Sequence, residues 1–521
     1  MAVDQATNVA NAPAEGAGGR GESVSRAYDQ LRELIVHGRL APGSRIIESD
    51  IADWLGLSRT PTRSALHRLQ QEGYVVALDR TKEGRLTVAP LTQSDAMELF
   101  QIVGRLEGMA AGATAERPAV ERAEVVTRLR ALNADLAAAG RAKSGQRRGV
   151  LDGVPISWKD LFDSADVATE AGSALLRGRT PSADAEVLQT ATREGLVCLG
   201  KTHMTELAFS GLGLNPVTAT PPCVNDDAAV PGGSSSGAAA SVAFGLAPAA
   251  IGSDTGGSVR LPSAWNDLVG LKTTSGRVSL RGVVPLCERF DTVGPLARSV
   301  QDCSLLLAAL EGRKPADLTA ATMGSARFLV LQTVALDDLR PAPAKGFDDA
   351  LARLSRAGAR IEHGHIPEVT EAMALAGALF TAEAYAIWGP TIEADPEKMY
   401  APVRERFRGG ASVKATDYIA GWRRLEVLRQ IWAQKTAAYD AVLLPTSAIL
   451  PPNAARLLAD PAFFTAENML ALRNTRIGNL FGLCVLTLPT AEPSCGISFM
   501  AAPMTEERLL RLGFAAERAL S

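Results

Sequence analysis

The stretch from Gly232 to Arg260 reads GGSSSGAAASVAFGLAPAAIGSDTGGSVR and decides the fold prediction. Two Gly/Ser clusters, one opening at Gly232 and one closing at Ser258, flank a block of small apolar residues. A flexible linker is polar throughout and carries no such block. The block from Ala238 to Leu246 can form a helix, and glycines at both ends allow close backbone approach. The pattern predicts a site where main-chain N–H groups face a reacting atom.

Further motifs lie on both sides of this stretch. They are GVPISWKD (153–160), GKTHMTELAFSG (200–211), LPSAWNDLVGLKTTSGRVS (261–279), FDTVGPLARSVQD (290–302) and YDAVLLPT (439–446). In this order they resemble the amidase signature family, which contains serine hydrolases that cleave amides with a Ser-Ser-Lys set. The resemblance covers about residues 146–521. It implies an α/β amidase-signature fold with a central mixed sheet covered by helices.

The resemblance assigns roles to three polar side chains. Ser258, which ends SDTGGS, matches the nucleophile. Ser234, the first serine of GGSSSG, matches the serine that relays a proton in the family. In the family the peptide bond before this serine is cis, and here that bond joins Gly233 to Ser234. Lys159 in GVPISWKD matches the base. Such a base is needed because a serine hydroxyl is a poor nucleophile until its proton is removed.

Lys159 can act as this base only if it loses its proton easily. The ordinary pKa of lysine is about 10.4, and a fall to about 7 corresponds to about 4–5 kcal/mol. Burial has this effect on lysine, and the approach from Val154 to Trp158 is largely apolar. The alternative is a lysine at a strand end that pairs with Asp160. The residue type alone favours the pairing with Asp160, but the GVP motif favours the role of Lys159 as the base.

The backbone beside Ser258 supplies the predicted oxyanion hole. The resemblance implies that the amides of Thr255, Gly256 and Gly257, together with that of Ser258, donate to the oxyanion. Glycines suit this role because no Cβ blocks the approach of the carbonyl group.

Asp254 and Arg260 flank the same loop and are expected to brace it, with a surface ion pair as the alternative for Arg260. The substrate pocket is expected to take side chains from residues 381–432 and 474–484. Neither segment contains a diagnostic motif, so the sequence leaves the particular small-molecule amide undecided.

The N-terminal part of the chain has a different pattern. Helical spacing of apolar residues, a turn at Pro42-Gly43 and the segment RTPTRSALHRLQQEG (59–73) predict three helices. Two short strands follow around the basic turn DRTKEGR (79–85). This order predicts a winged helix-turn-helix over residues 23–92, whose third helix enters a DNA major groove. The segments LRELIVHGRLAPGSRI and IADWLGLSRTPTRSALHRLQQEGYV resemble the DNA-reading domain of GntR-family regulators.

That resemblance implies DNA contacts by the turn and the start of the third helix. The expected contacts are Arg59, Thr60 and Arg63, with Arg39, His67, Lys82 and Arg85 as further candidates. Residues 20–90 contain 11 Lys and Arg against 9 Asp and Glu. Double-stranded DNA would therefore be bound through the placement of charges and through a homodimer rather than through bulk charge. The alternative is that these arginines only solvate a helix face.

Three further segments complete the predicted domain order. Residues 1–22 are rich in Ala, Gly and Asn and predict a disordered tail. Residues 93–145 predict a short helical linker that resembles a truncated effector domain of one GntR subfamily, without its metal ligands. The amidase domain over residues 146–521 is expected to lack the family's usual N-terminal helices.

Composition limits the class of protein. The chain has 521 residues, 46% of them apolar, and a net charge of −3, which is typical of a globular protein with two domains. No apolar run reaches the roughly 20 residues of a membrane span. Six scattered cysteines without a CxxC pair predict reduced thiols and a cytoplasmic location, and five histidines show no zinc pattern. We expect no metal and no cofactor.

Three functions remain open at this point. The first is an amide hydrolase that carries a DNA-reading domain. The second is a transcription regulator whose amidase-like body is a sensor without activity. The third is a non-functional fusion of two adjacent reading frames. The intact Ser-Ser-Lys set favours the first.

Overall fold

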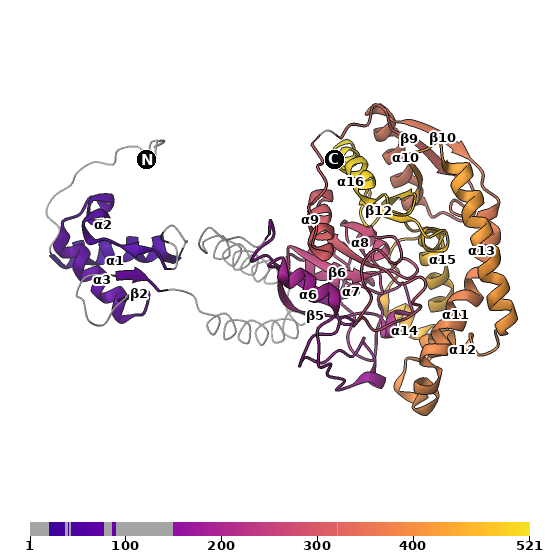
Figure 1. Cartoon of the computed structure of the whole chain (residues 1–521), viewed down its shortest axis with the longest axis horizontal. Helices are drawn as coiled ribbons and strands as arrows, with labels where there is room; N and C mark the ends of the chain where they lie inside the picture. The colour runs from indigo at the N-terminus through magenta and orange to yellow at the C-terminus, as the bar shows by residue number, and fades with distance from the viewer. Residues whose placement is uncertain (1–19, 37–39, 41–42, 78–85, 90–148, 320) are drawn as a thin grey trace. The chain divides into compact units, whose positions relative to one another are not determined.

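The computed structural model describes residues 20–36, 40, 43–77, 86–89, 149–319 and 321–521. These residues belong to two compact units, a smaller one before residue 90 and a larger one from residue 149, which are considered separately (Figure 1). Arg39, Lys82 and Arg85 lie outside the described residues, as does the whole predicted linker and most of the predicted tail.

The described part of the smaller unit contains three helices and a three-stranded antiparallel sheet in the order β1-β3-β2. Its elements are α1 (Arg20–Val36), β1 (Arg45–Ile46), α2 (Glu48–Leu55), α3 (Arg59–Gln71), β2 (Val75–Ala77) and β3 (Leu86–Val88). This arrangement confirms the predicted winged helix-turn-helix. Strand β1 was not predicted, and α1 begins at Arg20, inside the predicted tail.

Helix α3 is amphipathic, which explains how so small a unit forms a core. Ala65, Leu66 and Leu69 are buried and pack in one cluster with Leu31 of α1 and Val75 of β2. Residues three and four apart lie on one side of a helix. The opposite side of α3 is consequently free to carry polar residues.

The larger unit is built on a ten-stranded mixed sheet with the order β10-β9-β11-β13-β12-β7-β8-β6-β4-β5. The strands are β4 (Pro155–Lys159), β5 (Val197–Thr202), β6 (Ala249–Ser253), β7 (Val269–Lys272), β8 (Val293–Ala297), β9 (Arg327–Leu331), β10 (Arg360–Gly364), β11 (Ala441–Pro445), β12 (Cys484–Pro489) and β13 (Gly496–Ala501). Strand β4 is parallel to β5 and β6, and β9 is parallel to β10 and β11, whereas the other neighbours are antiparallel. The predicted central mixed sheet is confirmed.

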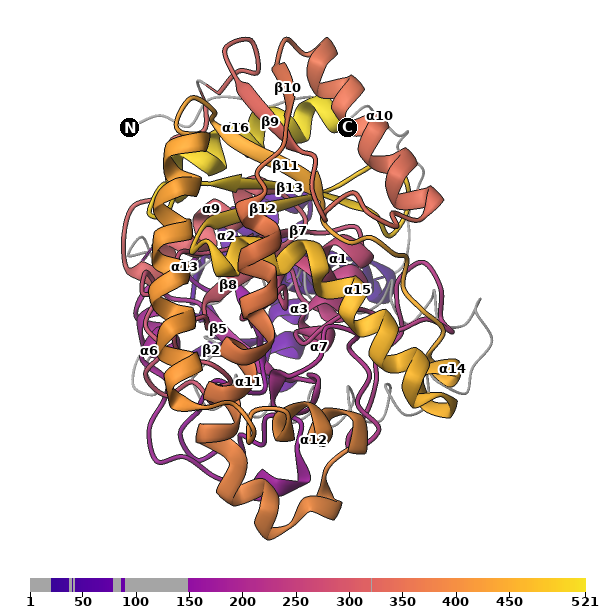
Figure 2. The same cartoon turned by 90° about the vertical axis from the view of Figure 1, so that its right-hand side faces the viewer.

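Helices cover both faces of this sheet. They are α6 (Glu186–Arg193), α7 (Ser236–Ala243), α8 (Arg260–Trp265), α9 (Val300–Glu311), α10 (Pro341–Arg356), α11 (Glu368–Ala394), α12 (Ala401–Arg408), α13 (Ala415–Thr436), α14 (Ala454–Ala459), α15 (Pro461–Leu480) and α16 (Glu506–Leu520). In β12, Leu486 packs against Gly513 of α16, and its neighbour Val485 packs against Gly478 of α15. Successive strand residues point to opposite faces, so α16 and α15 lie on opposite sides (Figure 2).

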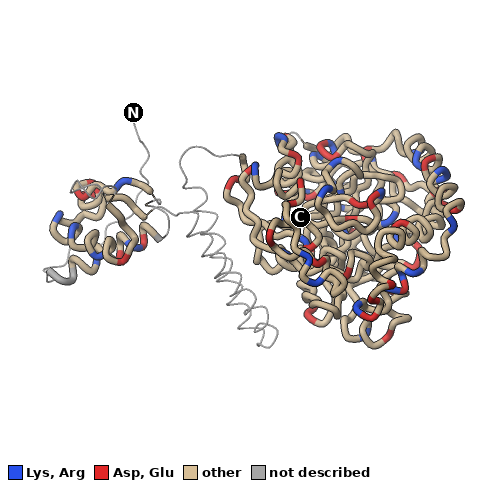
Figure 3. Tube along the Cα trace, turned by 60° about the horizontal axis from the view of Figure 1, so that its bottom comes forward, with Lys and Arg blue, Asp and Glu red and all other residues tan. Residues whose placement is uncertain are grey.

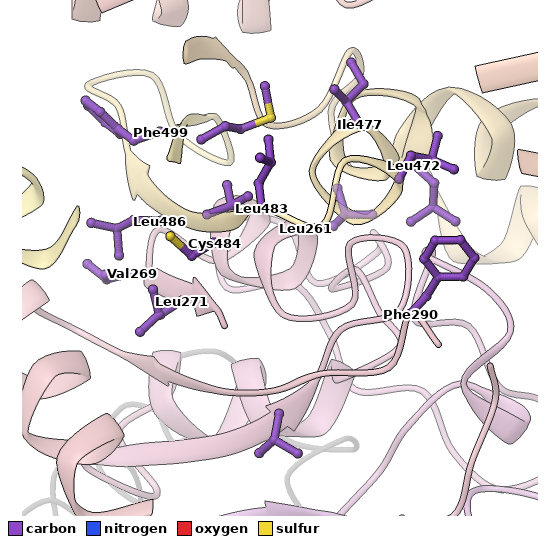
Figure 4. Packing of buried hydrophobic residues seen from close by; sticks show 14 of the residues in the cluster. Leu261, Val269, Leu271, Phe290, Leu472, Ile477, Leu483, Cys484, Leu486 and Phe499 are labelled. Atoms are coloured by element: carbon purple, nitrogen blue, oxygen red, sulfur yellow. The ribbon is translucent and has the colours of Figure 1, made fainter. Parts of the chain in front are cut away.

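The main core lies between the sheet and these helices. Figure 4 shows part of it, where side chains of β7, β12, β13 and α15 gather, among them Leu271, Leu486, Phe499 and Ile477. Burial of each such side chain contributes about 1.5–3 kcal/mol. The core therefore fixes the sheet edges from which the site loops extend.

Helix α11 is the one described helix that is long and apolar enough to cross a membrane by length and composition. It contacts α12, α13 and α15. Leu379 and Ala384 are fully buried, and the Phe380 ring stacks on Phe290 with centroids 4.3 Å apart. These contacts identify α11 as a core helix of the larger unit.

Candidate active site

Lys159 ends strand β4 and is completely buried. Its Nζ donates hydrogen bonds to Ser234 Oγ at 2.7 Å and to Ser253 Oγ at 2.8 Å. Strand β6 runs parallel to β4 and ends at Ser253, which explains why the side chains of Lys159 and Ser253 meet. The lysine thus faces two hydroxyl groups.

Burial lowers the pKa of Lys159 to about 7, although the carboxylates of Asp291 and Asp254 act in the opposite direction. A large fraction of this amine is therefore neutral at neutral pH. The alternative pairing with Asp160 is wrong, because Asp160 lies 3.2 Å from Lys201 Nζ instead. The structure thus gives Lys159 the buried environment that the apolar approach predicted.

The Gly/Ser cluster places Ser234 next to Lys159. The peptide between Gly233 and Ser234 is cis, as the family resemblance implies. A Cβ on Gly233 would come within 2.7 Å of Thr205 Oγ1, so the close approach of two chain segments requires glycine here. The Ser235 amide donates to Ser258 O at 3.2 Å, which joins the cluster to the loop that contains Ser258.

The loop between β6 and α8 presents Ser258 to a pocket that is also lined by Thr255 and Gly256. Within the described residues, the Ser258 hydroxyl and the amides of Thr255, Gly256 and Ser258 have no hydrogen-bond partner. The Gly257 amide differs, because it donates to Asp254 Oδ1 at 2.9 Å. The role of Gly257 as an oxyanion donor stays a prediction, and in this structure its N–H is used inside the loop.

Gly257 is required for a different reason. Its φ is +136°, and a Cβ at this position would lie 2.2 Å from Thr475 Oγ1 of α15. Thr475 is held there because its hydroxyl donates to Gly256 O at 2.7 Å. Glycine lets the loop approach α15 closely.

A buried ion pair supports the same loop. Arg260 donates to both carboxylate oxygens of Asp254, with Nε at 2.9 Å and Nη2 at 2.8 Å. Nη1 donates to Thr475 O, and Nη2 also donates to Asn479 Oδ1. Burial alone would raise the pKa of Asp254, but the Arg260 guanidinium outweighs it and holds the pKa well below its usual range. The two residues brace the loop from inside the protein, so the alternative of a surface pair is wrong.

Four residues that contact Lys159 or the loop from Asp254 to Arg260 were not predicted, namely Ser253, Asp291, Thr475 and Asn479. The carboxylate of Asp291 accepts the Thr255 hydroxyl at 2.5 Å. Asp291 also accepts two backbone amides, and burial raises its pKa. Ser253 and Asp291 lie within quoted motifs, but their residue types alone did not indicate a role.

The pocket beside Ser258 has one apolar side and one cationic side. Its apolar lining is Ala208, Phe209, Leu286, Phe380 and Leu472, joined by Ser210. The cationic lining is Arg406 of α12 and Arg476 of α15. Both arginines come from the segments predicted to line the pocket, whereas all of the apolar lining comes from elsewhere.

In the smaller unit, the described DNA-contact candidates gather on α3. Arg59, Thr60, Arg63 and His67 are exposed, and three of them follow one another at four-residue intervals, which places these three on one helix side. Arg63 is 76% exposed and its Nε lies 2.9 Å from Glu48 Oε2 of α2. This side of α3 is available to a partner.

The part of the chain that the structure describes contains no group of three or more His, Cys, Asp or Glu side chains able to hold a metal. All six cysteines are free thiols. The candidate site accordingly combines hydroxyl groups, one amine, backbone amides and the two guanidinium groups that line the pocket, and the Asp254–Arg260 pair and Asp291 support its loop.

Comparison with known proteins places this geometry in a family. Residues 110–510 match the family described as Amidase, and residues 23–81 match bacterial regulatory proteins of the gntR family. The 2-amino-5-chloromuconic acid deaminase of Comamonas testosteroni is 35% identical over 387 residues, which cover 72% of this chain and 83% of the relative. A glutamyl-tRNA(Gln) amidotransferase chain of Acidothermus cellulolyticus is 32% identical over 436 residues, 75% of this chain and 85% of the relative. The corresponding amidotransferase chain of Anaeromyxobacter dehalogenans (strain 2CP-C) is 47% identical over 195 residues, only 39% of its length.

Solved structures agree with these relatives. A crystal structure of an amidase superimposes with a TM-score of 0.66 at 28% identity, covering 80% of this chain and 99% of that one. The glutamyl-tRNA(Gln) amidotransferase chain from Thermotoga maritima superimposes with a TM-score of 0.61 at 26% identity, covering 72% and 84%. The fold and the relatives define a hydrolase that acts on carbon–nitrogen bonds. The chain belongs to the amidase family and carries an N-terminal domain of the gntR family.

The Amidase match begins at residue 110, before the predicted domain start at residue 146. The predicted linker over residues 93–145 thus overlaps the family match. The boundary between the two domains stays a prediction.

Proposed function

We propose that the larger unit hydrolyses a small-molecule amide through an acyl-enzyme intermediate, with Ser258 as nucleophile, Ser234 as proton relay and Lys159 as base. The observation that carries this proposal is the buried amine of Lys159, which has a pKa of about 7 and donates to Ser234 Oγ. A sensor without activity would gain nothing from a buried amine in this state. The hydrolase is therefore preferred over the regulator with an inactive body.

The first half of the reaction forms the acyl-enzyme. Neutral Lys159 takes the Ser234 proton while Ser234 takes the Ser258 proton, and Ser258 Oγ attacks the carbonyl carbon. The free amides of Thr255, Gly256 and Ser258 donate to the developing oxyanion, and one such donor contributes about 3–4 kcal/mol. The carbon–nitrogen bond then breaks, and the leaving amine receives the proton from Lys159 through Ser234.

The second half restores the enzyme. Water attacks the acyl group on Ser258 and gives up its proton along the same path to Lys159. The carbon–oxygen bond to Ser258 breaks, Ser258 recovers its proton, and the acid leaves. No cofactor takes part in either half.

A fluorophosphonate probe tests this assignment on the full-length protein. The probe forms a covalent bond with an activated serine, and peptide mapping by mass spectrometry locates it. We expect the label on Ser258. A label elsewhere, or no label on a folded protein, would contradict the proposed nucleophile.

We also propose that the smaller unit binds double-stranded DNA with α3 in the major groove. The exposed side of α3 with Arg59 and Arg63 supports this, and the domain match agrees with it. Paired half-sites on DNA are usually bound by two copies of such a domain, so we propose a homodimer. The six free thiols fit a cytoplasmic location, which DNA binding also requires.

Arg63→Ala is expected to weaken binding to the DNA upstream of the gene by about tenfold, because one base contact of this kind contributes about 1–3 kcal/mol. Gel-shift titration measures the affinity at fixed salt. Arg26→Ala on α1 removes an equal charge from another exposed position and serves as the control. Equal losses in both variants would show that only charge matters and would contradict the placement of α3 in the groove.

A further inference from the structure

Two arginines face the pocket that contains Ser258. Arg476 belongs to α15 and is 7% exposed, and Arg406 belongs to α12 and is partly buried. The Cγ atom of Arg476 lies 3.7 Å from the position of a Cβ on Gly256, which places its side chain beside the nucleophile loop. Two cations thus line the space that the reacting amide would enter.

Neither guanidinium forms an ion pair with a carboxylate anywhere in the described part of the larger unit. Arg406 donates to Phe209 O at 3.1 Å and lies over the Phe209 ring at 4.3 Å. Arg476 contacts Met469 Sδ at 3.5 Å. Buried Arg260 and Arg277 are different, because each is paired with a carboxylate, Asp254 and Glu506 respectively.

Burial of an unpaired charge is costly unless a counterion arrives. Burial lowers the pKa of Arg476 to about 10, and burial together with the Arg476 charge lowers the pKa of Arg406 to about 9. Both side chains still carry a full charge at neutral pH. The two cations repel each other in the empty pocket, and an anion between them would remove that repulsion.

We propose that the substrate is a small amide that carries a carboxylate, and that Arg406 and Arg476 bind this carboxylate while the amide carbonyl group lies at Ser258. This inference rests on the proposed function, since it names the substrate class of the same site. Arginine suits the role because its planar group binds carboxylates through paired hydrogen bonds.

The rest of the pocket limits the chemistry of this substrate. Phe209, Leu286, Phe380 and Leu472 supply an apolar lining. A short hydrocarbon spacer between the carboxylate and the amide fits such a lining. The monoamide of a short dicarboxylic acid has this chemistry.

The attraction for an anion is local to the pocket. The chain has a net charge of −3, and Figure 3 shows basic and acidic positions interspersed over the larger unit. A general positive field would attract any anion to the surface, and this distribution gives none. Removal of the pocket arginines is therefore expected to remove the preference for carboxylates.

Steady-state kinetics on matched substrates tests the inference. Succinamate, glutaramate and adipamate are compared with succinamide, glutaramide and adipamide, which replace the carboxylate by a neutral amide of similar size. We expect at least one monoamide to have a kcat/KM about tenfold or more above its neutral partner, because hydrogen bonds to charged groups are strong. Arg476→Met and Arg406→Met are expected to abolish this ratio mainly through KM, and Arg476→Lys to restore part of it.

Arg473→Met is the matched control. Arg473 lies on the same helix, does not line the pocket, and bonds to Ala335 O and Asn474 Oδ1. This variant is expected to keep the wild-type ratio. Circular dichroism checks that each variant is folded. A ratio near one in the wild type, or a ratio unchanged in both folded pocket variants, would overturn the inference and leave the proposed hydrolase intact.

Protection from covalent labelling supplies a readout without turnover. Succinate, glutarate or adipate is expected to slow fluorophosphonate labelling of wild-type Ser258, and the neutral diamides are not. Labelling that none of these dicarboxylates slows would overturn the carboxylate site. Absence of labelling at Ser258 would instead overturn the proposed function, so the two failures can be told apart.

Discussion

Ser258→Ala is expected to lower kcat by about 10⁴-fold or more for every amide that the protein hydrolyses, because removal of a catalytic nucleophile has an effect of this size. Ser258 lines the pocket and its hydroxyl forms no hydrogen bond with the described residues, so its loss removes no structural hydrogen bond. The variant should therefore fold normally. Release of amine, followed in a fixed-time assay, measures the effect.

Ser263→Ala provides the control for this change. Ser263 lies on α8, is also buried, and its hydroxyl donates only to Val259 O, directly before this helix, at 2.8 Å. Such a bond contributes little to helix stability, and turnover should stay within about threefold of the wild type. Similar losses in both variants would indicate damage to the fold, and retained activity in Ser258→Ala would rule out Ser258 as nucleophile.

Lys159→Met is expected to reduce kcat about as severely, because the proposed base and nucleophile act as one unit. For the same reason, the double variant with Ser258→Ala should be no less active than either single variant. If the reductions in kcat of the two single variants instead multiply in the double variant, the two residues act separately. In the wild type, kcat/KM should rise with pH through about 7, since the base must be neutral and burial lowers its pKa to that value.

The same lysine makes stability depend on pH. Its pKa is about 7 in the folded chain and about 10.4 in the unfolded chain. Between these values the unfolded chain binds more protons, so the free energy of unfolding should rise with pH from about 7 toward 10. Lys159→Met should remove part of this rise, whereas the exposed Lys414→Met should not. Urea unfolding at pH 7 and pH 9 measures the difference, and an unchanged slope in Lys159→Met would contradict the buried amine.

Much of this site could be predicted because its parts lie in short motifs. Ser234, Ser258 and Lys159 each sit beside glycine or apolar residues whose pattern is visible without a structure. The fold followed from the order of several such motifs, and the smaller unit from helical spacing and turn residues. Local patterns of this kind determine which strand or loop carries a group.

The remaining parts depend on contacts between distant segments. Nothing in residues 254–260 shows that the Gly257 amide is used by Asp254, because the loop conformation decides it. Likewise, Thr475 and Asn479 look like ordinary polar residues of a helix until α15 is placed against the loop. The lack of carboxylate partners for Arg406 and Arg476 could not be predicted, since pairing depends on the whole tertiary structure.

The hydrogen bonds between α15 and the loop that contains Ser258 determine when this loop can be completed during synthesis of the chain. Arg260 and its partner Thr475 are 215 residues apart in the chain. At ribosomal rates this separation corresponds to roughly 10–40 s of elongation. During that interval the nascent chain already contains Lys159 and both serines but lacks the helix that shapes their loop. We therefore expect the proposed catalytic set to become competent only after α15 has been synthesised.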